Sequence, residues 1–189
     1  TRMLLGRGAD TEVRSNLGNT AALLASFEGH TQVLSLLLST GANPEARNTP
    51  HMRTPLHYAA SRGHVECLKL LLAAGADCAA VSSLGWTPAH AAASRGRDDC
   101  LWMLLGAAPD IASALDHAGL TPADVAQENG HGGCMDMPVE LLLGRRDAGV
   151  DADMHKLRQC PPKKLVKQEQ YELDNVGGCL HREAGVELP

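Results

Sequence analysis

Cysteine and histidine are the residues of this sequence whose chemistry could go beyond packing, because thiolates and imidazoles bind metals and carry out nucleophilic or proton-transfer chemistry. The chain has six cysteines and nine histidines. No two cysteines form a C-x2-C or C-x4-C pair, so neither a zinc site nor a small disulfide framework is indicated. We therefore expect no metal and no cofactor.

The cysteines and histidines also recur at a fixed spacing. Cys67, Cys100 and Cys134 each lie four residues after a glycine, a place that Val33 holds earlier in the chain. A position that accepts valine or cysteine is typical of an apolar core, so we predict that these three are small buried residues. Histidines 57 and 90 each lie three residues after a threonine. Because they occupy equivalent positions, we favour a structural role for them over a catalytic one.

Motifs of known enzymes are missing from the sequence. It contains no H-E-x-x-H, no G-x-S-x-G and no Walker loop, and the glycine cluster at residues 130–133 follows an expected helix rather than a strand. We therefore expect a non-catalytic protein.

Composition narrows the class of protein further. Hydrophobic residues make up 44% of the chain and aromatic residues only 3%, which favours closely stacked helices over a β-sandwich. The net charge of −5 argues against a nucleic-acid partner, and the leucine runs are too short to span a membrane. The sequence shows no charged and apolar leader segment, so we expect the protein in the cytoplasm, the nucleus or both. We also expect a monomer.

The elements that must position these residues come from an internal repeat. Thr20, Thr54, Thr87 and Thr121 are separated by 34, 33 and 34 residues, and a glycine follows each of them nine residues later. In one copy, Thr54 is a suitable N-cap, Pro55 suits the first helical position, and Gly63 can end the helix in a left-handed conformation. Residues 65–72 then predict a second amphipathic helix.

The second copy carries a known signature. Residues 54–60 (Thr-Pro-Leu-His-Tyr-Ala-Ala), 63–64 (Gly-His) and 75–77 (Gly-Ala-Asp) resemble the ankyrin repeat. The resemblance covers roughly residues 1–143. It implies an all-α solenoid of helix-turn-helix units with β-hairpin loops at right angles to the helices, in which the signature histidine bonds across the helix start.

The resemblance also divides the chain. We expect the second half of a truncated repeat at 1–14, ankyrin repeats at 15–47, 48–80 and 81–113, a degenerate terminal repeat at 114–150, and a disordered tail at 151–189. Because the chain opens with half a repeat, we expect it to be a fragment.

Several copies depart from the pattern. The first lacks the proline and histidine, so its helix start should be less firmly set. Met52 replaces the loop glycine of the other copies, so we expect that loop to be rebuilt around Pro50. Ala108-Pro109 should weaken a helix end, and the last second helix should restart near Pro138.

The resemblance implies a partner-binding surface made of the hairpin tips and the ends of the first helices, which line a concave face. Carried over by offset from each threonine, these positions are Asn16, Leu17, Asn19, Phe27, Glu28, Pro50, His51, Arg53, Ser61, Arg62, Ser83, Leu84, Trp86, Ser94, Arg95, His117, Leu120, Glu128 and Asn129.

Trp86, Phe27 and the nearby arginines are candidates for the main contacts, since aromatic and arginine side chains are common interface hot spots. Three arginines on one groove would favour an acidic segment of a partner protein. The alternative is that Trp86 merely packs along the neighbouring hairpin.

The leading functional hypothesis is a scaffold or adaptor that binds another protein. Two alternatives stay open: a substrate receptor of a ubiquitin ligase, or the repeat segment of a larger enzyme or channel.

Overall fold

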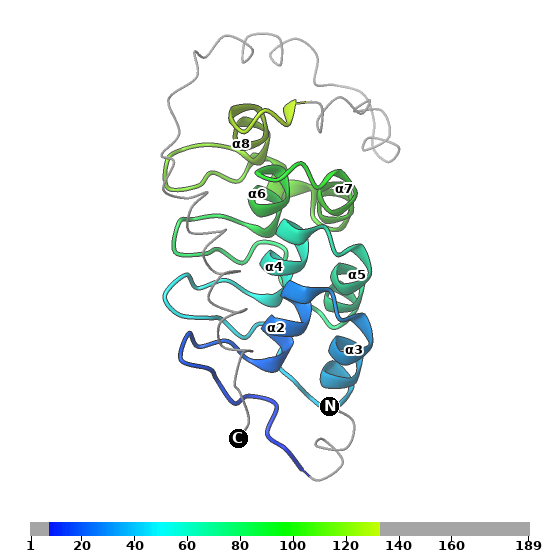
Figure 1. Cartoon of the computed structure of the whole chain (residues 1–189). Coiled ribbons are helices and arrows are strands. Elements are labelled where there is room, and N and C mark those ends of the chain that lie inside the picture. The colour runs from blue at the N-terminus through cyan, green and yellow to red at the C-terminus, as the bar shows by residue number, and fades with distance from the viewer. Residues whose placement is uncertain (1–7, 133–189) are drawn as a thin grey trace. The chain divides into compact units, whose positions relative to one another are not determined.

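The computed structural model describes residues 8–132 (Figure 1). Its helices are α2 (Ala21–Glu28), α3 (Thr31–Ser39), α4 (Pro55–Arg62), α5 (Val65–Ala73), α6 (Pro88–Ala93), α7 (Asp98–Ala107) and α8 (Pro122–Glu128), with the 3-10 helix η1 (Pro109–Ser113) between α7 and α8. No strand occurs within these residues. The prediction of an all-α repeat fold is confirmed.

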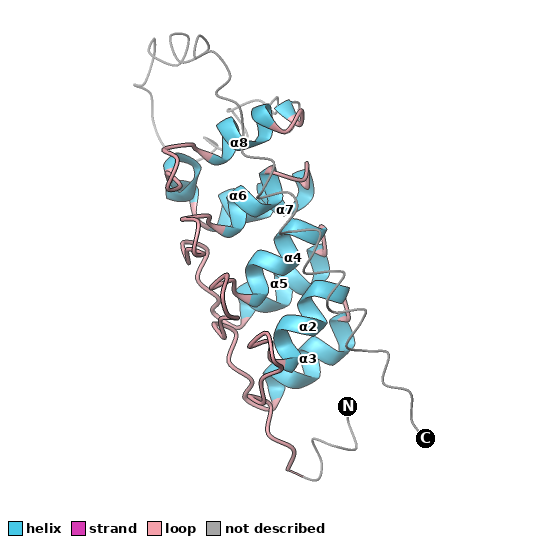
Figure 2. Cartoon of the chain, turned by 60° about the vertical axis from the view of Figure 1, so that its left-hand side comes forward, coloured by secondary structure: helices cyan, strands magenta, loops and turns pink. Residues whose placement is uncertain are grey.

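The helices form two columns (Figure 1). The first helices of successive copies, α2, α4, α6 and α8, pack on one another in that order, and α3, α5 and α7 form the second column beside them. Long loops join each second helix to the next first helix and gather along one edge of the stack (Figure 2). Each copy therefore covers its apolar face with the next copy.

Threonine caps the first helices as predicted. Thr54 and Thr87 precede helices that begin at a proline, and Thr121 does the same for α8. In the first copy the expectation of a looser start is not met, because the Thr20 hydroxyl accepts a bond from the Leu23 N–H at 3.4 Å and α2 begins at the equivalent place. A threonine N-cap is therefore enough to position this helix.

Small residues set the spacing of the first column. Ala59, Ala92 and Ala126 are repeat-equivalent and each is 0% exposed. A methyl group is the only side chain that lies between the backbones at this level, so the first helices can approach closely. Leucines fill the space behind them, and Leu68 and Leu101, also 0% exposed, belong to the same core.

The loops close like hairpins without forming assigned strands. The Ser82 N–H donates to the Trp86 carbonyl at 2.9 Å, and residues 15–19 and 116–120 close in the same way. Neighbouring loops also bond to each other, since the Ser83 N–H donates to the His51 carbonyl at 2.9 Å. The loop glycine matters here: Gly85 has a φ of 77°, and a Cβ on it would lie 2.8 Å from the backbone nitrogen of His117.

The loop before Thr54 is rebuilt in part. Its closing bond runs from the Asn48 N–H to the Arg53 carbonyl at 3.1 Å, so it holds one residue more than the other loops. Met52 nevertheless keeps the left-handed conformation of the glycine that it replaces, with a φ of 55°. The extra residue lies at the Pro50 side of the loop, and the backbone turn itself is preserved.

The third copy ends differently, as its sequence predicts. Where the second copy has a glycine at φ 84° after its second helix, α7 is followed by Ala108 and the 3-10 turn of η1. Ile111 on this turn is buried and joins the core.

Some predictions lie outside the described residues: the start of the half repeat, the helix near Pro138, Cys134 and the tail at 151–189. Within residues 8–132, no helix combines the length and the apolar character that crossing a membrane requires.

Candidate functional site

Histidine 57 joins two repeats. Its Nδ1 lies 3.2 Å from the Thr54 backbone nitrogen, whose N–H it accepts, and its Nε2 lies 2.8 Å from the Trp86 carbonyl oxygen in the next loop. Nε2 therefore carries the proton and donates it to that carbonyl. Burial lowers the pKa of His57 to about 4, so the ring is neutral at pH 7.

His90 repeats this arrangement one copy later. It lies 3.2 Å from the Thr87 nitrogen and 3.1 Å from the Leu120 carbonyl, and burial lowers its pKa as well. In both rings Nδ1 accepts a bond at the helix start of its own copy, and Nε2 donates to a carbonyl of the next copy. The structural role predicted for these histidines is confirmed.

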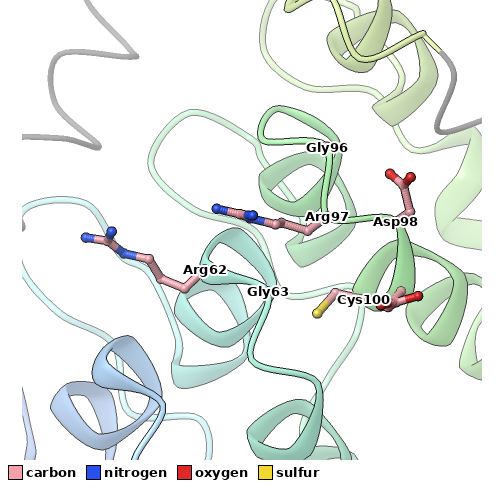
Figure 3. Close-up of a pocket in the computed structure, with 7 residues that line it drawn as sticks. Arg62, Gly63, Gly96, Arg97, Asp98 and Cys100 are labelled. Atoms are coloured by element: carbon pink, nitrogen blue, oxygen red, sulfur yellow. The ribbon is translucent and has the colours of Figure 1, made fainter.

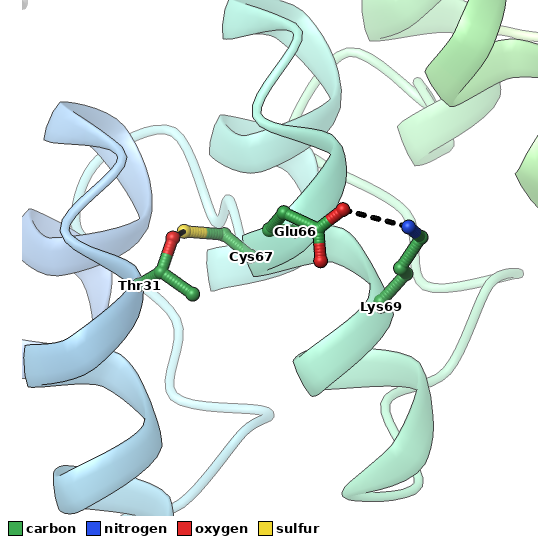
Figure 4. A network of polar contacts seen from close by, with 4 residues as sticks. All are labelled: Thr31, Glu66, Cys67 and Lys69. Atoms are coloured by element: carbon green, nitrogen blue, oxygen red, sulfur yellow. Dashed lines mark hydrogen bonds and ion pairs between the residues drawn. The ribbon is translucent and has the colours of Figure 1, made fainter.

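Two of the three repeat cysteines lie in the described region, and both are core residues. Cys67 and Cys100 are 0% exposed, and the Cys67 sulfur lies 3.6 Å from the Thr31 hydroxyl of the preceding repeat (Figure 4). Burial raises the pKa of Cys67, and that of Cys100 to about 11, so both thiols are protonated and weak nucleophiles. Nearby, the Glu66–Lys69 ion pair of 2.7 Å is exposed.

The predicted partner surface is divided by burial. Thirteen of its positions are exposed or half-buried, and we call twelve of them the partner surface: Asn16, Leu17, Glu28, His51, Arg62, Ser83, Leu84, Arg95, His117, Leu120, Glu128 and Asn129. They lie on the loops and at the ends of the first helices. Pro50 is also exposed, beside His51.

The other predicted positions are buried, which corrects the expectation that they face a partner. These are Asn19, Phe27, Arg53, Ser61, Trp86 and Ser94, with exposed fractions of 1–5%. The offset from a capping threonine gives the place of a residue in its own repeat, whereas the packing of adjacent repeats decides its exposure.

Trp86 shows the reason most clearly. It is 3% exposed, and its indole Nε1–H donates to Oδ2 of Asp116 in the next loop at 3.1 Å. The other oxygen of Asp116 accepts the backbone N–H groups of Ala118 and Leu120. Packing along the neighbouring hairpin, the alternative that the sequence left open, is therefore the correct interpretation of Trp86.

Phe27 has a comparable role between the first two copies. Its ring meets the Tyr58 ring edge-on at a centroid distance of 5.5 Å, and the Arg62 guanidinium lies 4.1 Å above its centre. The cation–π contact orients the Arg62 side chain while leaving it half-buried. The Tyr58 hydroxyl in turn accepts a bond from the Asn48 amide at 3.0 Å.

A pocket of about 310 Å³ opens between the second and third copies (Figure 3). Its lining comes from the end of α4, the turn before α7 and the first turn of α7: Arg62, Gly63, Gly96, Arg97, Asp98, Asp99 and Cys100. Sequence reasoning missed Arg97, because it stands where three copies have histidine. That departure from the repeat was the signal that could have found it.

Each copy is thus a unit in which a threonine caps the first helix, while the bridging histidine and the small residues of the core contact the next copy. Comparison with known families agrees: a model of ankyrin repeats in three copies matches residues 1–82, and a single-repeat model matches residues 84–114. The chain belongs to the ankyrin repeat family. No curated protein matches it.

Ankyrin repeats are in general modules that bind other proteins. Within residues 8–132, no three histidine, cysteine, aspartate or glutamate side chains gather as a metal site would require. The chemistry that this part of the chain offers is that of a surface: loop tips, helix ends and arginine side chains held by neighbouring repeats.

Proposed function

We propose that this ankyrin array is a non-catalytic scaffold that holds a partner protein on the partner surface, through an acidic segment of that partner. The observation that carries the proposal is the contrast between fixed and variable positions. Loop-to-loop bonds and bridging histidines repeat between copies, whereas equivalent surface positions hold different residues, such as Glu28 and Arg95. Variable side chains on a constant frame can recognise a partner without changing the stack.

Charge favours an acidic partner at the centre of this surface. Arg62 and Arg95 come from adjacent copies and occupy the same helix-end position of the repeat, eight residues after the capping threonine, while Glu28 and Glu128 lie at the two ends of the array. Complementary charges raise the rate and the specificity of association more than they raise its strength. Binding should therefore weaken as salt concentration rises.

Within this proposal the protein acts as a monomer in the cytoplasm or the nucleus. A role as substrate receptor of a ubiquitin ligase, or as the repeat segment of a larger enzyme or channel, would use the same surface. Loss of partner capture by variants of the partner surface is expected for each of these roles.

The test compares two charge reversals that carry the same change in net charge. The double variant Arg62→Glu, Arg95→Glu should lose the proteins that wild type enriches in quantitative affinity capture. The control Lys69→Glu, Arg14→Glu alters positions away from the helix ends and should retain them. Melting curves establish that each variant is folded. Equal recovery of the same partners by wild type and by the folded Arg62, Arg95 variant would refute the proposed surface.

A further inference from the structure

The pocket between the second and third copies holds two arginines that neighbouring repeats position. The Arg97 Nε–H donates to the Ser61 carbonyl at 3.4 Å, and its Cδ lies 3.0 Å from where a Cβ of Gly63 would be. Arg62 is held over Phe27. Both side chains extend to the same side of the pocket (Figure 3).

Arg97 occupies a place that is structural in the other copies. His64, its equivalent, donates its Nε2–H to the Phe27 carbonyl oxygen at 3.1 Å and covers Gly29. Arginine keeps both contacts through its aliphatic stem and Nε, while its two terminal nitrogens extend beyond the turn. Within residues 8–132, Arg97 forms no ion pair. The substitution therefore adds a guanidinium to this turn without giving up the inter-repeat contact.

The other wall of the pocket limits the charge of an occupant. Asp98 and Asp99 are in the first turn of α7, and Figure 3 shows the Asp98 carboxylate directed away from the two guanidinium groups. They interact favourably with the positive end of the helix, and they would repel a dianion more strongly than a group with a single negative charge. A single carboxylate fits between the arginines better than a phosphoryl group does.

From these contacts we infer that the pocket is a subsite for one carboxylate side chain of the partner's acidic segment, which Arg62 and Arg97 clamp from two adjacent repeats. This inference rests on the proposed function. It adds where one side chain of the acidic segment binds and which chemical group that side chain carries. Guanidinium and carboxylate form charge-assisted hydrogen bonds of well-defined geometry, so the subsite would set the register of the segment.

The probe is a fluorescein-labelled hexaglutamate peptide, with hexaglutamine as the uncharged control. Arg97→His is the sharpest variant, since it restores the residue of the other copies and keeps the contact with Gly63. We expect it to weaken hexaglutamate binding about tenfold at pH 7.5, the loss of roughly one charge-assisted bond. Lys69→Gln removes the same charge elsewhere and should change affinity less than about twofold.

Two further readouts separate the outcomes. In NMR spectra of wild type, the Arg62 and Arg97 Nε–Hε signals should shift with hexaglutamate and stay unchanged with hexaglutamine. A phosphoserine in place of one glutamate should not tighten binding. If Arg95→Gln weakens binding while Arg97→His does not, the subsite is refuted and the proposed surface stands. Absence of any shift of the two arginine signals at millimolar peptide also overturns the subsite.

Discussion

At the scale of single residues, the side chains that looked most reactive are the ones most involved in holding the stack. His57 and Cys67 are buried, and each contacts a neighbouring repeat through one polar atom. Neutral imidazoles and protonated thiols fit such sites because a buried charge without a partner is costly. The polar atoms of these two side chains therefore stabilise the contacts between repeats.

A pH effect on stability follows from His57. Its pKa is about 4 in the fold and 6.5 in an unfolded chain, so below pH 6.5 the unfolded state binds more protons and stability falls until about pH 4. The loss from this one group is about 3 kcal/mol over that range. Urea unfolding at pH 7, 5.5 and 4.5 measures it.

The control for this effect is His57→Gln. It should be less stable at pH 7, because the bond to the Trp86 carbonyl of the next repeat and the bond from the Thr54 N–H are lost, but it should depend less on pH between 6.5 and 4. Part of the dependence will remain, since the pKa of His90 is lowered too. An unchanged pH slope in the variant would mean that His57 is already accessible to protons in the fold.

Leu71 tests the packing between the two columns of helices. The side chain is 0% exposed and belongs to the hydrophobic core. Leu71→Ala should lower the free energy of unfolding by about 2–5 kcal/mol, the range of large-to-small core substitutions. Chemical denaturation provides the measurement, with the exposed Lys69→Ala as the comparison, for which we expect a change within about 0.5 kcal/mol. Similar effects from both variants would contradict the core assignment.

At the scale of elements, each loop needs a residue with positive φ at its tip, and in one copy that residue is not a glycine. Gly18, Gly85 and Gly119 have positive φ at the loop tip, and Met52 adopts the same conformation without the freedom of glycine. The Met52 side chain is 41% exposed, so little packing offsets the strain. Relief of this conformation should therefore stabilise the loop.

Met52→Gly should raise the free energy of unfolding by up to about 1 kcal/mol, because relief of the left-handed conformation outweighs the larger entropy of the unfolded chain. Gly85→Ala should do the opposite, since its Cβ would meet the next loop at 2.7–2.8 Å. The thermal midpoints of the two variants relative to wild type provide the measurement. A fall in stability for Met52→Gly would show that the side chain makes contacts that matter.

At the scale of the whole molecule, the described residues form a one-dimensional array. Within their column, the first helices pack on the preceding and the following first helix, through positions such as Ala59, Ala92 and Ala126. The stability of such an array is close to a sum of repeat and interface terms. A change at one interface should therefore be felt mainly by the repeats on either side.

Ala92→Leu places a larger side chain in the middle of the column. We expect a loss of about 1–3 kcal/mol from overpacking, together with faster amide hydrogen exchange in α4, α6 and α8 than in α2. Hydrogen exchange followed by mass spectrometry can compare these helices directly. Uniform acceleration in all four would indicate a single cooperative unit.

The sequence by itself determined the repeat, the cap residue of each first helix and the core. These features are encoded locally: a threonine N-cap, a glycine nine residues on and leucines on one helical face act within a single copy. The roles of His57 and Cys67 could also be predicted, because repeat equivalence marks a position that packing holds constant.

Only the tertiary structure decided which variable side chains face outward. Trp86 is equivalent to Asn19 and Arg53 along the chain, and all three are buried, whereas Leu120 at the same offset is half-buried. Their exposure depends on whether the adjacent copy presents a partner such as Asp116, which lies 30 residues away. The contacts between repeats therefore decide which of the predicted positions are buried in the stack and which belong to the partner surface. The sequence pattern within a single repeat does not decide this.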